Sequence, residues 1–359
     1  MHPSRFSILA FISLAAWAQV PPQQQAAPPA APAQQAKPVQ EAKPDDAGAQ
    51  IKVQSTEVIV PVTVTDSKDR FVSNLTVKDF KIFEDGKEQK IVYFSAEHNQ
   101  PMVIGFLMDL SNASRLHWKT FQDAAMELVW NLLPGDRDSK MSGFLVTYAT
   151  DAELAVDTTA DSEKIVDRLR KVKPGGGAAL YDAIYLACTR HSPVKGEPIS
   201  PRRVLIVIGD GNDNSSKYTL DQVVEIAQRH QVTIYGVSTV AYGFTSEGEK
   251  NLTRLAEETG GRVEYPLQGV YSDVAGFLSQ PSDEGNYAIK VGTGGYASQI
   301  AKGLFNAIAK IAGEMTTQYV IRYVPSGESD KAFHNIKVEV VDLPDVKVRV
   351  RKGYYAGNP

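Results

Sequence analysis

The segment DLSNAS, residues 109–114, has the residue types that a hard cation binds, and it directly follows the apolar run at 102–108. A second acid, Asp210, ends another apolar run at 203–209. In an open parallel sheet, ligands bind outside the carboxyl ends of the strands, so neighbouring strands would bring both carboxylates to one crevice. Carboxylate and hydroxyl oxygens, completed by water, are ligands for Mg²⁺ or Mn²⁺. Asp109, Ser111 and Asp210 therefore form a candidate metal site.

Three other interpretations of these acids stay open. Asp109 and Asp210 would also serve as loop caps without a metal, and their repulsion would then raise the pKa of one. Residues 210–221 follow a calcium-loop spacing, but Ser215 replaces the glycine and a strand precedes the loop, which disfavours calcium. A two-carboxylate hydrolase would use the acids as general acid and base, yet nothing else in the predicted crevice orients a substrate.

Several other classes of site find no support in the sequence. The glycines at 175–177 belong to no nucleotide-binding motif and are expected to let a loop pass close to the crevice. The sequence contains no G-x-S-x-G motif, and its six histidines form no close pair, so it indicates neither a serine hydrolase nor a zinc site. The only cysteine, Cys188, lies on an apolar helical face. The net charge of −4, with both signs mixed, gives no indication of nucleic-acid binding.

The N-terminal segment reads as a targeting sequence. Arg5 precedes the apolar stretch 6–16, and Ala16-Trp17-Ala18 fits a cleavage site, which predicts a signal peptide over 1–18. A retained anchor is the alternative, although the stretch is short for a membrane span. Residues 19–50 are rich in Pro, Ala and Gln and are expected to form a disordered tether. We expect a secreted, periplasmic or cell-envelope protein with no transmembrane span after signal removal.

Residues 101–316 alternate between solidly apolar strands and amphipathic helices. This pattern predicts an α/β domain with a doubly wound, mostly parallel, Rossmann-like sheet covered on both faces. The segment 266–300 is rich in Gly and Ser and interrupts the alternation of strands and helices. We interpret it as a surface insertion before a last helix, which is expected over 304–315.

The flanking segments 51–100 and 317–357 have the period-two pattern of strands. Pro61 in the first run predicts an edge position, and Asp85-Gly86 predicts a hairpin. Neither segment is long enough to make a sturdy domain alone. Together they predict one β-sandwich into which the α/β domain is inserted.

The order of these motifs resembles the von Willebrand factor A (VWFA) domain: an apolar strand, D-x-S, a helix, a hairpin, GGGAALYDAI, and an apolar strand ending in GDG. The flanks, among them FKIFEDGKEQKI and VKVRVRKGYY, resemble the VWFA-related family of acidobacterial type over about 51–357. The resemblance implies a metal-ion-dependent adhesion site (MIDAS) with the pattern D-x-S-x-S, a Thr and an Asp. Asp109, Ser111 and Asp210 match it, whereas Ala113 and Ala178 replace the expected hydroxyls. Ser114 lies one position late, so the site is degenerate and we expect millimolar Mg²⁺ or Mn²⁺ binding or none.

The resemblance also implies a function in protein binding or cell adhesion without enzymatic activity. In an intact site of this family, an acidic side chain of the protein partner completes the coordination of the metal. Here we expect recognition to depend on the loops around the crevice, with no nucleotide or nucleic acid involved. The candidate rim residues are Asn112, Arg115, Trp118, Tyr181, Asn212, Asp213, Tyr242 and Phe244. Trp118 and Tyr181 fit the core equally well, and a purely structural envelope module with a vestigial site is the alternative function.

Overall fold

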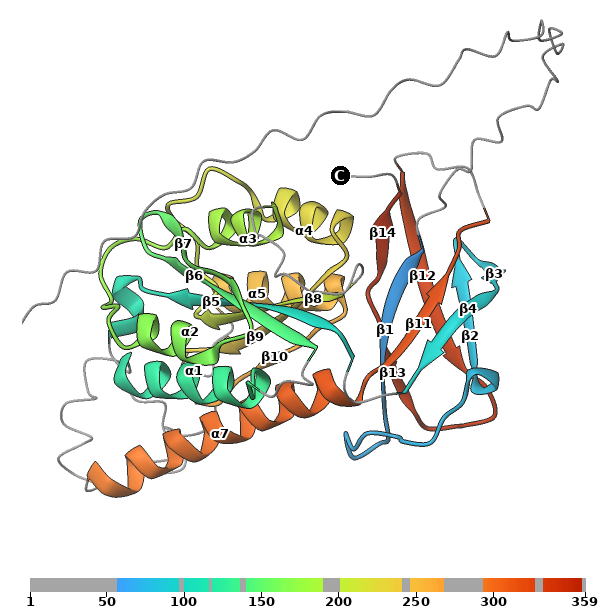
Figure 1. Ribbon diagram of the computed structural model, residues 1–359, viewed down its shortest axis with the longest axis horizontal. Coiled ribbons are helices and arrows are strands. Elements are labelled where there is room, and N and C mark those ends of the chain that lie inside the picture. Colours follow the sequence, from blue (N-terminus) through green and yellow to red (C-terminus); the bar gives the residue numbers. More distant parts are fainter. Residues whose placement is uncertain are drawn as a thin grey trace, which may run out of the picture. The chain divides into compact units, whose positions relative to one another are not determined.

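The computed structural model describes residues 57–96, 100–115, 118–135, 140–189, 201–240, 246–267, 293–326 and 332–356. The predicted signal peptide and tether, together with the rim candidates Tyr242 and Phe244, lie outside these ranges. Within them the chain forms a central α/β domain and two antiparallel sheets built from the flanking segments (Figure 1). This arrangement confirms the fold class that the sequence predicts.

The sheet of the α/β domain has the strand order β10-β9-β8-β5-β6-β7. Every neighbouring pair is parallel except β6 and β7, which form the expected antiparallel hairpin. The central strands β5 and β8 are almost wholly buried, because helices cover both faces of a parallel sheet. The strands are β5 (Met102–Asp109), β6 (Met141–Tyr148), β7 (Ala152–Thr159), β8 (Arg202–Gly209), β9 (Val232–Ser238) and β10 (Val263–Glu264).

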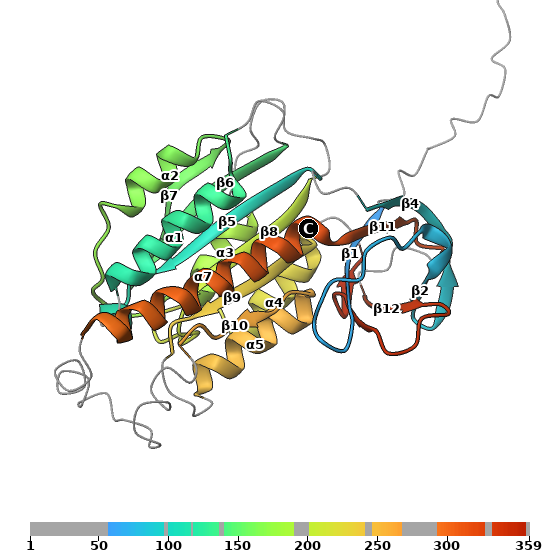
Figure 2. The same ribbon diagram turned by 90° about the horizontal axis from the view of Figure 1, so that it is seen from below.

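Two layers of helices sandwich this sheet, and each layer has its own apolar cluster. On one face pack α1 (Trp118–Leu132), α2 (Ser162–Leu169) and α7 (Thr293–Thr317) (Figure 2). The opposite face carries α3 (Leu180–Thr189), α4 (Leu220–Arg229) and α5 (Glu247–Thr259). Local signals set the helix ends: the Asp161 side chain caps α2, and Gly260 ends α5 in the left-handed region.

The flanking strands form two four-stranded antiparallel sheets with the orders β13-β1-β11-β4 and β14-β12-β2-β3. Each sheet combines strands from both flanking segments, so pairing joins residues far apart in the chain, such as Val60 and Ile321. Apolar side chains of both sheets share one core, to which Ile82 and Val338 contribute. The strands are β1 (Val58–Thr65), β2 (Phe80–Glu84), β3 (Lys87–Gln89), β4 (Ile91–Ser95), β11 (Tyr319–Tyr323), β12 (Phe333–Val340), β13 (Lys347–Arg349) and β14 (Gly353–Tyr355).

Arg202, at the start of β8, contacts both chain segments that connect the sandwich to the α/β domain. Its backbone N–H donates to Pro101 O at 2.9 Å, and its guanidinium donates to Met315 O at 3.0 Å. The guanidinium also contacts Gln318, which in turn donates to Thr63 Oγ1 at 2.8 Å. The Arg202 side chain is buried, and this burial lowers its pKa.

A buried carboxylate on α7 extends this junction. Glu314 is fully buried and forms ion pairs with Arg262 and Arg349. Its Oε1 accepts hydrogen bonds from Tyr235 Oη at 2.9 Å and Thr63 Oγ1 at 3.2 Å. Strands β1, β9 and β13 therefore converge on one charged side chain of α7. Burial, and secondly the Glu314 charge, raise the pKa of Tyr235 well above its ordinary value.

Two details differ from the sequence-based expectations. Helix α7 begins at Thr293 rather than near Leu304, so the last residues of the predicted insertion are helical, while residues 268–292 lie outside the described ranges. Strand β1 is an interior strand and not an edge strand. Pro61 is tolerated because β13 pairs only with residues 63–65, and Pro61 has a ladder partner on one side alone. Among the described helices, none is both long and apolar enough to cross a membrane.

Candidate metal and partner-binding crevice

The fold brings Asp109 and Asp210 to the same edge of the sheet. Strands β5 and β8 are parallel neighbours, with Met108 opposite Ile208, so the acids that follow lie at adjacent carboxyl ends. A cavity of about 350 Å³ opens at this edge. Backbone and polar side chains from three loops line it: Ser111, Asn112, Ala113, Gly176, Ala178, Asp210, Asn212, Asp213 and Asn214.

Asp109 is a buried carboxylate that the protein satisfies only in part. Its side chain is 1% exposed, and Oδ1 accepts a hydrogen bond from Ser111 N at 2.7 Å. Its Oδ2 and the Ser111 hydroxyl have no hydrogen-bond partner among the described residues. Burial raises the pKa of Asp109 to about 6, and the charge of Asp210 adds to the rise. The repulsion expected between the two acids is present, but desolvation is the larger cause.

Tyr148, which the sequence did not single out, lies beside this carboxylate. It pairs with Asp109 across β5 and β6, and its hydroxyl is also buried without a hydrogen-bond partner among the described residues. Burial, followed by the charges of Asp109 and Asp210, raises the pKa of Tyr148 well above its ordinary value. Buried polar groups normally form hydrogen bonds. This cluster of donors and acceptors without hydrogen-bond partners among the described residues therefore fits a bound cation or ordered water.

The position of Ser114 in the first loop could not be read from the D-x-S-x-S motif. Residues Asn112–Arg115 form a short 3-10 helix, in which Ala113 is exposed and Ser114 is buried. The Ser114 hydroxyl lowers the pKa of the Asp109 carboxyl, which places it beside that carboxyl, and it has no hydrogen-bond partner among the described residues. Ala113 lines the cavity, whereas Ser114 is buried and does not.

The other two loops offer fewer free ligand atoms for a metal. Both oxygens of Asp210 accept hydrogen bonds from Asn212, from the backbone N–H at 2.9 Å and from Nδ2 at 2.7 Å. Ala178 lines the cavity where the family motif has a hydroxyl, and its N–H donates to Asn214 Oδ1 at 2.8 Å. Asp109 and Ser111 thus fit a hard cation directly, whereas Asp210 is partly engaged and Ala178 offers no ligand. The donor set fits a weakly held cation that keeps most of its water.

The rim residues divide into two groups. Asn112, Asn212 and Asp213 line the cavity, and Arg115 is exposed at the end of the 3-10 helix. Asp213 also organises the rim, since its carboxylate accepts from the backbone N–H of Tyr181 at 3.0 Å.

Trp118 and Tyr181 do not belong to an exposed rim. Tyr181 is 9% exposed and packs in the apolar cluster beneath α3, and burial raises its pKa to about 12. Trp118 is half-buried and packs against the cluster on the other face of the sheet. Both are held by apolar contacts at the starts of their helices, as the core interpretation of these residues expects. Their role in partner binding stays a prediction.

The glycine loop passes close to the crevice, as the sequence indicates. Gly176 has a φ of 109°, in a region that favours glycine. A Cβ on Gly177 would overlap Ser215 Oγ and come within 2.9 Å of Asn214 Oδ1. The calcium-loop interpretation is not supported, because Asp221 forms an ion pair with Arg254 at 2.6 Å instead.

Comparison with known proteins gives the central domain its family. Residues 104–268 match the family model of the von Willebrand factor type A domain. No curated protein matches the chain.

Solved structures that are similar to parts of this chain come from several organisms. Proximal thread matrix protein 1 from the mussel byssus is 20% identical, with a TM-score of 0.38, over 48% of this chain and 42% of that chain. BatB from Bacteroides thetaiotaomicron is 19% identical, with a TM-score of 0.36, over 56% of this chain and 98% of that one. The vWF domain of the pilus tip protein Mfa5 from Porphyromonas gingivalis is 18% identical, with a TM-score of 0.28, over 32% and 39%. The chain spans less than half of the mussel protein. From the family match over residues 104–268 and the parallel sheet that carries the crevice, we conclude that the central α/β domain of this chain is similar to the von Willebrand factor type A domain.

Proposed function

We propose that the protein is a non-enzymatic binding module of the cell exterior or envelope that presents the crevice to a protein partner. The observation that carries the proposal is the set of unsatisfied buried groups, Asp109 Oδ2, Ser111 Oγ and Tyr148 Oη, of which Ser111 lines a cavity of about 350 Å³. A purely structural module would have no need of unsatisfied polar groups at this edge, because each of them lowers stability. The location rests on the N-terminal sequence, which resembles a signal peptide.

A weakly bound Mg²⁺ or Mn²⁺ completes this proposal. Asp109 and Ser111 would hold the cation, with Asp210 nearby, and the remaining positions would be filled by water. A cation there would supply positive charge for an acidic group of the partner. Hydrolysis by the two acids is less well supported, since the described crevice offers no cationic or imidazole side chain among its lining residues to orient a substrate.

Titration of Mg²⁺ and Mn²⁺ into the full chain by calorimetry tests the metal. We expect saturable binding in the millimolar range that is lost in Asp109→Ala and in Asp210→Ala, because each removes a charge from the site. An exposed-residue variant, Asp123→Ala on α1, is the control and should bind as the wild type does. Absence of saturable binding in the wild type would remove the cation from the proposal and leave the loop surface alone.

Restoring the two missing hydroxyls should strengthen the site. The double variant Ala113→Ser, Ala178→Thr adds oxygen atoms at two positions that line the cavity. We expect Mg²⁺ to bind at least about tenfold more tightly, since two waters would be replaced by fixed ligands. Ala149→Ser, outside the cavity lining, is the matched control for an added hydroxyl. Unchanged affinity in the double variant would mean that these positions do not face the cation.

A further inference from the structure

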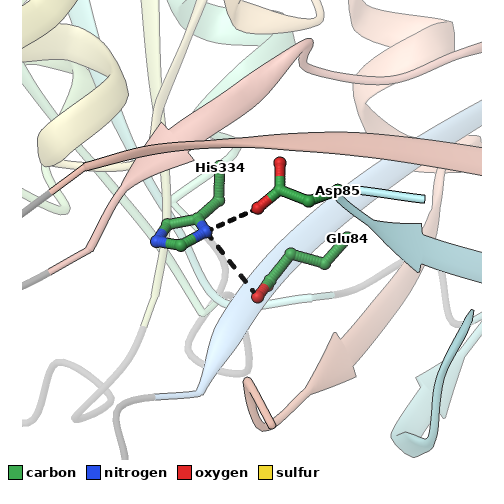
Figure 3. Close-up of side chains that lie close together, drawn as sticks. All are labelled: Glu84, Asp85 and His334. Carbon is green, nitrogen blue, oxygen red and sulfur yellow. Dashed lines mark hydrogen bonds and ion pairs between the residues drawn. The ribbon is translucent and has the colours of Figure 1, made fainter. Parts of the chain in front are cut away.

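We propose that Glu84, Asp85 and His334, at one end of the β-sandwich, form a second metal site that is distinct from the crevice and takes a zinc-like divalent cation. One ligand atom of each residue lies within 4.8 Å of the other two. Figure 3 shows the three side chains converging, with His334 Nδ1 facing both carboxylates. The distance from Nδ1 is 2.8 Å to Asp85 Oδ2 and 3.9 Å to Glu84 Oε1.

The sandwich pairing brings these distant residues together. Strand β12 runs antiparallel to β2, with Ile336 opposite Glu84, so His334 lies just beyond the end of β2. Side chains alternate along a strand, and Glu84 follows the inward-facing Ile82 at period two, as His334 precedes Ile336. Both ligands therefore point to the inner side of the sandwich. The Asp85-Gly86 turn has positive φ at both residues, as a type I′ hairpin requires, and it places Asp85 beside them.

Each carboxylate has one oxygen held by the protein and the other directed at His334. Glu84 Oε2 accepts from Tyr323 Oη at 2.5 Å and Tyr354 Oη at 3.1 Å, which leaves Oε1 toward the imidazole. Asp85 Oδ1 accepts from the Asn335 N–H at 2.8 Å, which leaves Oδ2 toward the imidazole. Ordered partners behind each ligand are what a metal site needs, because they fix the ligands before the cation arrives.

Burial and geometry favour a metal over a simple surface ion pair. The side chains of Glu84 and His334 are 6% and 14% exposed, while Asp85, at 47%, keeps the site open to solvent. Four-coordinate zinc, with bonds of about 2.0–2.2 Å, places neighbouring ligand atoms roughly 3.3–3.5 Å apart. The two separations from Nδ1, 2.8 and 3.9 Å, bracket that value, and the two carboxylates lie within 4.8 Å of each other.

The donor set also fixes the class of cation. One imidazole nitrogen and two carboxylate oxygens suit zinc and related transition metals, whereas an all-oxygen set suits Mg²⁺. Binding would displace any proton on Nδ1, and water would fill the fourth position. The two sites of this protein are thus expected to differ in metal preference, and each can be removed without touching the other.

Zinc titration of a crevice-disabled protein tests the assignment. The metal-free full chain carrying Asp109→Asn is titrated with Zn²⁺ by calorimetry, and we expect one saturable site with micromolar affinity. Adding Asp85→Asn or His334→Gln should weaken it at least about tenfold, and Tyr354→Phe about tenfold by loosening Glu84. His230→Gln, at the end of α4, is the matched histidine control and should leave the affinity unchanged.

Asp85→Asn keeps the hairpin, because Asn-Gly is favoured in a type I′ turn, and a thermal melt confirms that each variant is folded. Zinc affinity that survives both Asp85→Asn and His334→Gln would overturn the proposal, since the ion would then bind elsewhere. So would the absence of saturable binding up to the millimolar range in the Asp109→Asn protein.

Discussion

Asp109→Asn is expected to raise the free energy of unfolding of the metal-free protein by about 2 kcal/mol at neutral to alkaline pH. Burial raises the pKa of this carboxyl from 3.8 to about 6, a shift equivalent to about 3 kcal/mol against the ionised folded state. Asparagine has nearly the same shape and no charge. Part of the gain is lost, because its oxygen accepts a weaker hydrogen bond from Ser111 N than the carboxylate does.

The pH dependence of this gain has a defined sign. Between about pH 4 and pH 6 the folded protein binds more protons at Asp109 than the unfolded chain, so its stability falls as pH rises. Asparagine does not titrate, so the two proteins should differ little near pH 4 and most above about pH 7. Urea unfolding at both ends of this range measures it, with fluorescence from Trp118 and Trp130 on α1 as the probe.

The control for this experiment is Asp123→Asn, an exposed acid on α1, which should change stability by no more than about 0.5 kcal/mol at either pH. Saturating Mg²⁺ should narrow the gap between wild type and Asp109→Asn, because only the wild type has the carboxylate to bind it. If Asp109→Asn were less stable than the wild type at alkaline pH, the ionised Asp109 carboxylate would not destabilise the folded protein.

Glu314→Ala is expected to lower the free energy of unfolding by about 3–5 kcal/mol. Glu314 is fully buried and is the shared partner of Arg262, Arg349, Tyr235 and Thr63. Removing it leaves the Arg349 guanidinium without this carboxylate, reduces Arg262 to its ion pair with Glu264, and leaves two buried hydroxyls without their acceptor. Urea denaturation of the full chain at pH 7 gives the measurement.

Lys310→Ala, one turn earlier on the same helix, separates loss of charge from loss of a buried partner. Lys310 pairs with Glu264 at 3.3 Å, but its side chain is 61% exposed. An exposed ion pair contributes little, so this variant should cost less than about 1 kcal/mol. If Glu314→Ala cost no more than Lys310→Ala, the network around Glu314 would contribute no more than a surface pair.

Local patterns in the sequence were enough to predict most of the fold. Solid apolar runs predicted β5 and β8, and the acids at their ends predicted the crevice edge, because parallel neighbours share that edge. Alternating valines predicted β1, whereas the inference from Pro61 that β1 is an edge strand was wrong. A proline lacks a hydrogen-bond donor only at its own backbone nitrogen. Strand β13 pairs with residues 63–65 of β1, which do not include Pro61.

The details of the crevice depended on tertiary structure. The 3-10 helix turns Ser114 inward and Ala113 outward, a rotation that motif spacing does not encode. Tyr148 enters the site only through its register opposite Asp109. His334 lies 249 residues from Asp85, so the cluster with Glu84 arises from strand pairing alone, and the absence of close histidine pairs said nothing about it.

The sandwich drawn from both flanks of the α/β domain has a consequence for how the chain is made. Strands β1 to β4 leave the ribosome long before β11 to β14, with which β1, β2 and β4 pair in the two sheets. The α/β domain has all its strands between them and can close first, since domains fold as units during synthesis. Until the late strands arrive, the early ones expose unpaired edges, which promote aggregation. The last event in maturation is thus the slow, non-local docking of the C-terminal strands, and a chaperone that shields β1 to β4 would act in that interval.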